Sequence, residues 1–356
     1  MRILLGIFAI AIYGGITFYL GWNLRAWLHS LQVFRWPVLF WSVLFLTSFG
    51  YFLGKLHVLL TPFSVLGSYW LFFLQYGLVL CIVANLIVFF TPLSTKVVGT
   101  SVVGILLVLL AVGTYFAYTP VVRQATITIE KPGEDMRVVL GSDFHLGLLS
   151  GKGHLEKFVA LSNEQKPDLV LLAGDIVDDS PQRFIDQGMG ELMKSLQATY
   201  GVYGILGNHE YYGNEIPEFK QAMKASNVEI LMDETILIGE RFYLTGREDL
   251  TNKSRVELSA LQPADSALPW FVMNHTPDDL DEPAKLGVDF HVSGHTHKGQ
   301  MWPNEYITKK IFELDYGHRQ KEQMHALVSS GFGFWGPPTR IGSQSELWVI
   351  DIQFSK

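Results

Sequence analysis

Residues 204–210 read GILGNHE, an apolar run followed by a glycine and three polar side chains, and this pattern decides the fold of the C-terminal part of the chain. An apolar run ends at Gly207 and is followed directly by an amide, an imidazole and a carboxylate, in Asn208, His209 and Glu210. Glycine permits a tight turn after a buried strand. The pattern therefore predicts a strand that ends in a loop presenting polar side chains.

Four other segments of the C-terminal part repeat this design. They read GSDFHLG at residues 141–147, LAGDIVD at 172–178, VMNH at 272–275 and VSGHTH at 292–297. Side chains two apart on an extended backbone point the same way, so Asp143 and His145 of the D-x-H pair can both reach one ion. The last segment carries two imidazoles at the same spacing. The candidate ligands are Asp143, His145, Asp175, Asn208, His275, His295 and His297, with His209 beside them.

Each segment alone has a structural explanation. A single histidine at a strand end is more often structural than functional, Asp143 or Asp175 can cap a helix, and Asn208 can be a turn residue. The conjunction argues otherwise, because five of the eleven histidines fall in these segments. Nitrogen and oxygen donors without a thiolate suit Mn, Fe or Zn better than Ca or Mg. The single cysteine, Cys81, excludes a disulfide framework and a cysteine-based zinc site.

Around these segments, short β-rich runs alternate with amphipathic helical stretches, which predicts a layered α/β architecture. The predicted strands cover residues 125–129, 137–142, 169–173, 202–206, 242–245, 270–274, 290–293, 326–329 and 346–352. The predicted helices cover residues 154–163, 181–198, 216–226 and 277–286.

Residues 1–120 differ in composition, with five basic residues and no acidic one. Four apolar stretches, at residues 3–21, 36–54, 67–90 and 98–118, are each close to the about 20 residues that a helix needs to cross a bilayer. We expect a four-helix transmembrane domain over 1–120 and a catalytic domain over 121–356, with the first stretch retained because no small-x-small cleavage site follows it. No charge lies mid-helix, which argues against a transporter. Gln75 and Asn85 are expected to form hydrogen bonds between helices.

The charges are divided unevenly between the two parts. The chain has 27 basic and 34 acidic residues. Residues 121–356 contain 22 of the basic residues and all 34 acidic ones, which gives this part a formal charge of −12. An acidic surface argues against a nucleic-acid partner, whereas a phosphate substrate stays compatible because bound cations would dominate the local field. Four crossings place both termini on one side, and the positive-inside rule then favours a cytoplasmic catalytic domain. The basic residues counted on that side are Arg2, Lys55, Arg123, Lys131 and Arg137, against Arg25, Arg35 and Lys96 on the other.

The ordered series D-x-H, G-D, G-N-H-E, H and G-H-x-H resembles the calcineurin-like metallophosphoesterase superfamily, over residues 136–354. The whole chain is similar to its membrane-anchored bacterial, YkuE-like branch. The resemblance implies a four-layer αββα sandwich and two divalent transition metal ions, Mn, Fe or Zn. It implies that Asp143, His145 and His297 hold the first metal, that Asn208, His275 and His295 hold the second, and that Asp175 bridges both. His209 would be the non-ligand histidine that contacts the phosphoryl oxygen or protonates the leaving group.

The implied function is a metal-dependent hydrolase of a phosphodiester, phosphomonoester or pyrophosphate. The short linker at residues 119–123 makes a lipid-linked substrate attractive, with the chain integral to a bacterial cell membrane. The alternative is a membrane sensor or partner-binding module with a structural metal site. An intact His209 argues against that alternative, because a purely structural site has no use for it.

Some positions stay open. Lys298 stands where the branch usually has glycine, and we expect it to point to solvent rather than to contact phosphate. Ser330 stands where relatives often carry arginine. Asp178 and Glu210 are either groups that orient histidine ligands or solvated loop acids. Residues 332–338 either pack on their own aromatic side chains, which we favour, or line a lipid pocket or the membrane interface.

Overall fold

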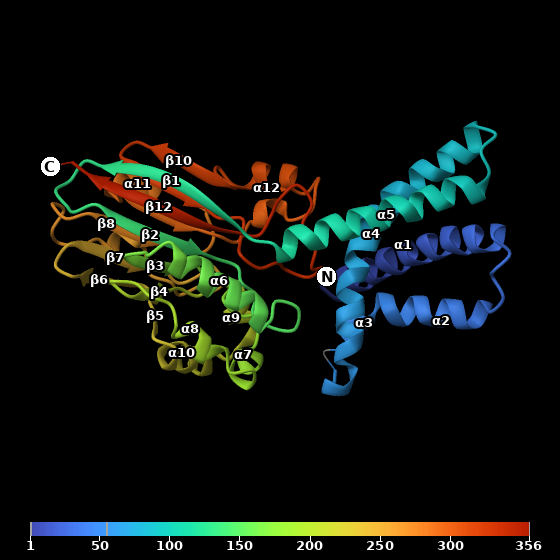
Figure 1. Cartoon of the computed structure of the whole chain (residues 1–356), viewed down its shortest axis with the longest axis horizontal. Helices are drawn as coiled ribbons and strands as arrows, with labels where there is room; N and C mark the ends of the chain where they lie inside the picture. Colours follow the sequence, from blue (N-terminus) through green and yellow to red (C-terminus); the bar gives the residue numbers. More distant parts are fainter. Residues whose placement is uncertain (1, 55, 356) are drawn as a thin grey trace. The chain divides into compact units, whose positions relative to one another are not determined.

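The computed structural model describes residues 2–54 and 56–355, so that Met1, Lys55 and Lys356 lie outside the described residues. The chain forms two compact units, Met1–Thr114 with Gly336–Thr339, and Tyr115–Trp335 with Arg340–Lys356. The first is helical and the second contains both β-sheets (Figure 1).

Three helices of the described chain are long and apolar enough to cross a membrane. The helical unit consists of α1 (Arg2–Ser30), α2 (Pro37–Ser48), α3 (Gly50–Gly54), a 3-10 turn (Val58–Leu60), α4 (Thr61–Phe90) and most of α5 (Thr95–Tyr118). The three long helices are α1, α4 and α5. Asn85 of α4 donates a hydrogen bond to the Tyr19 hydroxyl of α1 at 2.8 Å, which confirms the interhelical role expected for this amide.

The expectation of one spanning helix over residues 36–54 is wrong. Phe49 separates α2 from α3, and the 12 residues of α2 extend only about 18 Å at 1.5 Å per residue. Figure 1 shows α2 running back along α1, so that the α2–α3 pair returns the chain to the end at which α1 began. The break allows α3 to pack backbone to backbone on α4, because a Cβ atom at Gly50 or Gly67 would collide with the opposite main chain.

The second unit contains two six-stranded sheets. The first has the order β1-β12-β2-β3-β4-β5 and the second β10-β11-β9-β8-β7-β6. The strands of the first sheet are β1 (Val121–Ile129), β12 (Glu346–Phe354), β2 (Met136–Gly141), β3 (Leu169–Leu172), β4 (Val202–Gly204) and β5 (Val228–Ile230). Those of the second are β10 (Gly317–Lys321), β11 (Met324–Val328), β9 (Phe290–Ser293), β8 (Trp270–Met273), β7 (Phe242–Gly246) and β6 (Glu234–Ile238).

Three hydrophobic clusters hold the layers together. Side chains from both sheets, such as Leu140, Leu171, Phe271 and Phe290, form the central cluster. The outer face of the first sheet packs on helices, among them α6 (Lys152–Glu164) and α10 (Ile216–Ala225). The outer face of the second sheet packs on Leu280 and α11 (Asp281–Leu286). These layers confirm the expected helix–sheet–sheet–helix sandwich.

Most of the expected elements are present, with three kinds of exception. Each expected strand is found within a few residues, whereas the short strands β5, β6 and β10 were not expected. The helix expected over 181–198 is two short helices, α7 (Gln182–Asp186) and α8 (Met189–Met193), because Gly188 takes a left-handed conformation with φ 62° between them. The helices α9 (Asn208–Gly213) and α12 (Glu305–Ile311) were also not expected.

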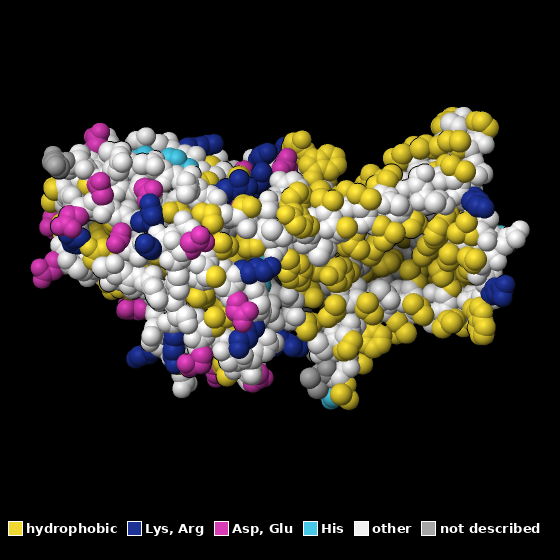
Figure 2. Space-filling view, in the orientation of Figure 1, with side chains coloured by type: hydrophobic (Ala, Val, Ile, Leu, Met, Phe, Trp, Pro, Cys, Tyr) yellow, Lys and Arg dark blue, Asp and Glu magenta, His cyan; other side chains and the backbone are white. Residues whose placement is uncertain are grey.

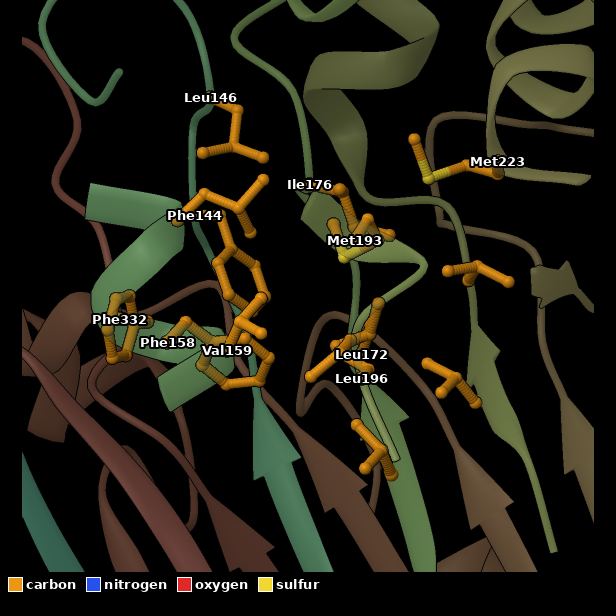
Figure 3. Close-up of a cluster of buried hydrophobic side chains, with 14 of the residues drawn as sticks. Phe144, Leu146, Phe158, Val159, Leu172, Ile176, Met193, Leu196, Met223 and Phe332 are labelled. Atoms are coloured by element: carbon orange, nitrogen blue, oxygen red, sulfur yellow. The ribbon is translucent and has the colours of Figure 1, made fainter. Parts of the chain in front are cut away.

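The topology brings the conspicuous segments to one edge of the sandwich. Strands β2, β3 and β4 are parallel, as are β7, β8 and β9, so that within each sheet their carboxyl ends face the same way. Phe144, at the first of these ends, turns inward onto Phe158 and Phe332 (Figure 3). This buried ring anchors the loop that carries Asp143 and His145 on either side of it.

Candidate metal centre

Two groups of buried ligand-type side chains share Asp143. One consists of Asp143, His145 and His297, and the other of Asp143, Asp175 and His275; within each group the ligand atoms lie within 4.8 Å of one another. His145 Nε2 is 3.2 Å from His297 Nε2, and His275 Nε2 is 3.2 Å from Asp175 Oδ2. The same Asp175 oxygen lies 3.8 Å from His145 Nε2. Asp175 therefore stands between the two sets of histidines.

Asn208 and His295 form a pair beside the second group. Asn208 Oδ1 is 2.9 Å from His295 Nδ1, and the His295 ring stands edge-on to that of His275, with 5.2 Å between centroids. The structure thus brings all seven expected ligand side chains to one edge of the sandwich. His209 lies there too, its ring 4.6 Å from that of His145.

The backbone at these positions is unusual. Asp143, His145, Asp175, His295 and His297 all have φ between 46° and 70°, in the left-handed region that non-glycine residues rarely adopt. Each such residue costs on the order of 1–3 kcal/mol and persists only where the surroundings hold it. This concentration of strained residues makes the cluster a candidate functional site.

Two glycines let the loops approach closely. A Cβ atom on Gly294 would collide with the Asp143 carboxylate, and one on Gly207 would collide with that of Asp175. In return, backbone N–H groups reach these carboxylates: His295 N lies 2.9 Å from Asp143 Oδ1, and His209 N lies 2.9 Å from Asp175 Oδ1. Gly294 and Gly207 are therefore needed for the close approach of the loops to the Asp143 and Asp175 carboxylates.

Burial and mutual contact shift the pKa values in the cluster. Burial lowers the pKa of His145 to about 3 and that of His295 to about 4, so both imidazoles are neutral near pH 7 and offer a lone pair. Burial raises the pKa of Asp143 to about 6. Burial opposes charge at His275, but Asp175 outweighs it and raises the pKa of His275 to about 10.

The donor set fits divalent metal ions. The Nε2 atoms of His145 and His297 face each other at 3.2 Å, and His145 Nε2 lies 3.8 Å from Asp175 Oδ2, so nitrogen and carboxylate donors converge where a cation could bind. His275 Nδ1 lies 2.8 Å from the Ala173 carbonyl, and this contact directs its other nitrogen to Asp175. Such backbone partners are typical of metal-binding histidines.

His209 has acidic partners on its Nδ1 side. Its Nδ1 lies 2.8 Å from Asp179 Oδ1 and 3.6 Å from Asp178 Oδ1. Burial disfavours the charged ring, but the hydrogen bond to Asp179 and the nearby carboxylates raise the pKa of His209 to about 9. Asp179 was not among the expected site residues. The signal available in the sequence was the pair of consecutive aspartates at 178 and 179.

Glu210 is a structural brace rather than a solvated acid. Its side chain is buried and accepts hydrogen bonds from the backbone N–H groups of Asp175, Val177 and Gly207 at 2.7–3.1 Å. It therefore fixes the loop of the bridging candidate and orients no histidine. Asp178 is partly exposed, and its carboxylate lies 3.8 Å from His145 Nδ1.

Arg340 is a second residue whose position the sequence did not reveal. It is fully buried, donates to the Ser330 and Gly333 carbonyls at 2.6 Å, and has Nη2 3.3 Å from His297 Nδ1. The arginine thus braces the 330–333 turn beside the cluster. The Ser330 hydroxyl instead donates to the Gln344 carbonyl.

Two other expectations are now resolved. Lys298 neither points freely to solvent nor faces the cluster, because its ammonium lies 4.6 Å from the centroid of the Tyr316 ring. Its φ of 51° explains why glycine suits the position. Phe332 and Phe334 are buried, as favoured, whereas Trp335 remains 49% exposed.

Comparison with known proteins agrees with this geometry. Residues 136–299 match the family model described as Calcineurin-like phosphoesterase. An uncharacterized metallophosphoesterase of Campylobacter jejuni is 28% identical over 67% of this chain and 64% of its own length. A transmembrane protein with metallophosphoesterase domain from Danio rerio is 29% identical over 66% of this chain and 57% of its own. The uncharacterized metallophosphoesterase YkuE of Bacillus subtilis is 26% identical over 62% of this chain and 80% of its own length.

The match spans less than two thirds of the length of the first of these relatives. The residues that the family model matches, 136–299, lie in the unit that contains both sheets and include all eight site residues. Residues 136–299 therefore match a calcineurin-like phosphoesterase domain, as the ordered motifs predicted.

Proposed function

We propose that the cluster is a binuclear metal centre that hydrolyses a phosphoric ester or anhydride. Asp143, His145 and His297 hold one ion, Asn208, His275 and His295 hold the other, and Asp175 bridges them. The observation that carries the proposal is the position of Asp175 Oδ2, which lies 3.2 Å from His275 Nε2 and 3.8 Å from His145 Nε2. Mn, Fe or Zn suits this donor set.

Two such ions, when bound, would supply a water of lowered pKa and would neutralise charge on the phosphoryl oxygens. The chain's own part is to hold the ligand atoms in place and to deliver a proton. As the water oxygen forms its bond to phosphorus, the bond to the leaving oxygen breaks, and protonated His209 donates its Nε2 proton to that oxygen. Asp179 keeps His209 protonated and oriented through Nδ1.

The remaining features favour a membrane enzyme. We propose residues 1–120 as the membrane domain and 121–356 as the catalytic domain, joined by the two residues between α5 and β1. The α2–α3 return keeps Arg25, Arg35 and Lys96 at one end of the helical unit. They are outnumbered by the five basic residues counted on the side of the catalytic domain, and the positive-inside rule therefore favours a cytoplasmic catalytic domain. A substrate presented by a bilayer, such as a lipid phosphoester, suits this tether.

The test is hydrolysis of bis-p-nitrophenyl phosphate by the purified chain with added Mn²⁺, against Asp175→Asn. We expect turnover that a chelator abolishes and that the variant lacks. A protein that binds two Mn²⁺ ions yet hydrolyses neither this ester nor lipid phosphoesters would overturn the proposal in favour of a sensor or binding module. Mixed micelles should be better substrates than soluble analogues; equal rates would exclude a lipid-linked substrate.

A further inference from the structure

Helix α12 turns its apolar side away from the protein. Tyr306 and Ile307 are each 59% exposed and Ile311 is 66% exposed, and no residue of this helix is buried. Trp302 before the helix is 51% exposed and Trp335 is 49% exposed. A helix on the surface of a water-soluble protein buries its apolar side. We call these five side chains, Trp302, Tyr306, Ile307, Ile311 and Trp335, the α12 face.

The α12 face is held in place by specific contacts. Gln300 donates to the Trp335 carbonyl at 2.8 Å and accepts from its N–H at 2.9 Å. Trp302 N donates to the Ile341 carbonyl at 2.7 Å. At the other end, the Thr308 hydroxyl donates to Asp315 Oδ2 at 2.8 Å. The exposure of the face is therefore a built feature and not that of a frayed segment.

Basic side chains accompany the aromatic ones. Lys309 lies over the Tyr306 ring at 5.8 Å and 3.7 Å from Glu305 Oε1, and Lys310 has no ion-pair partner among the described residues. Figure 2 shows basic and hydrophobic side chains next to one another in the region where Figure 1 draws α12. Tryptophan and tyrosine favour the membrane–water interface, and lysines favour anionic headgroups. The composition fits an anionic bilayer surface better than a protein partner, because lysine is depleted at the core of protein interfaces.

The α12 segment is coupled to the metal centre. The helix begins eight residues after His297, and the Phe312 ring that follows it stands edge-on to the ring of His295, with 6.0 Å between centroids. The Thr296 hydroxyl, between the two histidines of the G-H-x-H run, donates to the Asp315 carbonyl at 2.6 Å. A surface that binds α12 therefore lies close to the site at which a substrate must enter.

We propose that the α12 face docks on the headgroup region of an anionic bilayer and presents the metal centre to it. Only two residues separate α5, which ends at Tyr118, from β1, which begins at Val121, so the catalytic unit follows almost directly in sequence on the helix proposed to enter the membrane. The inference rests on the membrane anchoring proposed above and does not depend on hydrolysis.

The test uses the full chain in nanodiscs that contain phosphatidylglycerol. A spin label is placed on a cysteine at Tyr306 in a Cys81→Ala background, and a matched control label at Leu237, which is 46% exposed on strand β6. Collision with oxygen, which concentrates in lipid, is compared with collision with a water-soluble nickel chelate. We expect the oxygen-to-nickel ratio to be severalfold higher at 306 than at 237, and a label at Ile311 to behave like the one at 306.

Charge reversal provides the second arm. Lys309→Glu with Lys310→Glu should lower the ratio at 306 toward that at 237, whereas Lys220→Glu with Lys224→Glu on α10 should leave it unchanged. Equal ratios at 306 and 237 would mean that water covers the face, and low collision with both reagents would mean that protein covers it. Either result overturns the proposal, and neither depends on whether the protein hydrolyses a phosphoester.

Discussion

His209 Nδ1 lies 0.8 Å closer to Asp179 Oδ1 than to Asp178 Oδ1, at 2.8 Å against 3.6 Å. The second of two consecutive aspartates is thus the hydrogen-bond partner of the histidine. Asp179 itself has φ 63°, in the left-handed region, and this conformation accompanies the approach of its carboxylate to His209 Nδ1. This relationship assigns different roles to two residues that look interchangeable in the sequence.

Replacing Asp179 by asparagine should shift the pH dependence of turnover. Because the Asp179 hydrogen bond and the nearby carboxylates raise the pKa of His209 to about 9, the proton donor is present below that pH and is lost above it. In Asp179→Asn the alkaline limb of kcat should move to lower pH by about one unit or more, and each unit corresponds to about 1.4 kcal/mol. Asp178→Asn is the matched control and should move it less; an equal or larger shift would contradict the assignment.

Replacing Glu210 should release the loop that carries Asp175. Its carboxylate accepts from three buried backbone N–H groups, and each one left unpaired costs about 1–3 kcal/mol. Glu210→Ala should therefore lower the thermal midpoint by several degrees and weaken Mn²⁺ binding, measured by calorimetry. Glu210→Gln should be milder because one oxygen remains. The exposed Glu218→Gln serves as the control, and a wild-type Mn²⁺ affinity in Glu210→Ala would show that the brace does not position the ligand.

A single added methyl group should distinguish a required glycine from a permissive one. A Cβ atom on Gly294 would collide with the fully buried Asp143 carboxylate, whereas one on Gly153, in α6, meets nothing within 4 Å. Gly294→Ala should lower the bound Mn²⁺ content by displacing Asp143, while Gly153→Ala should keep it and slightly stabilise the helix. The metal content of both purified variants checks this; full occupancy in Gly294→Ala would mean that the loop can relax.

The clustering of the candidate ligands was predictable because they follow apolar strands, all but His275 after a glycine, and the parallel strands bring these loops together. The conformations of the ligands were not predictable. Nothing in the letters D-F-H indicates that Asp143 and His145 both have positive φ, since tertiary contacts impose it. The role of Asp179 has the same origin, because it depends on a turn rather than on residue type.

The errors in the fold also have physical reasons. Residues 36–54 are continuously apolar, so hydropathy cannot reveal that α3 breaks away from α2 to pack on Gly67 of α4. Strand β10 has mostly exposed polar side chains, since it lies at the edge of its sheet, and its sequence carries no alternation of apolar residues. Amphipathic spacing predicted one helix over residues 181–198, but the left-handed conformation of Gly188 interrupts it.

The buried His291 should make the catalytic domain less stable in mild acid. Burial, aided by Arg247, lowers the pKa of His291 to about 4, from about 6.5 in the unfolded chain. Between pH 4 and pH 6.5, His291 is therefore protonated in the unfolded state and neutral in the folded state. The contribution of neutral His291 to the free energy of unfolding is fully present above pH 6.5 and is lost as the pH falls toward 4. At pH 5 the domain is less stable by about 2 kcal/mol than above pH 6.5.

Replacing this histidine isolates its contribution. His291→Leu removes the titrating group from a fully buried position on β9, so the difference in thermal midpoint between pH 7 and pH 5 should be smaller than in the parent protein. Burial also lowers the pKa of His318 on strand β10, but this residue is largely exposed, so His318→Leu should reduce that difference less than His291→Leu does. The midpoints are measured with metal-free protein, so that loss of metal in acid does not contribute. An undiminished pH effect in His291→Leu would assign the acid sensitivity to other groups.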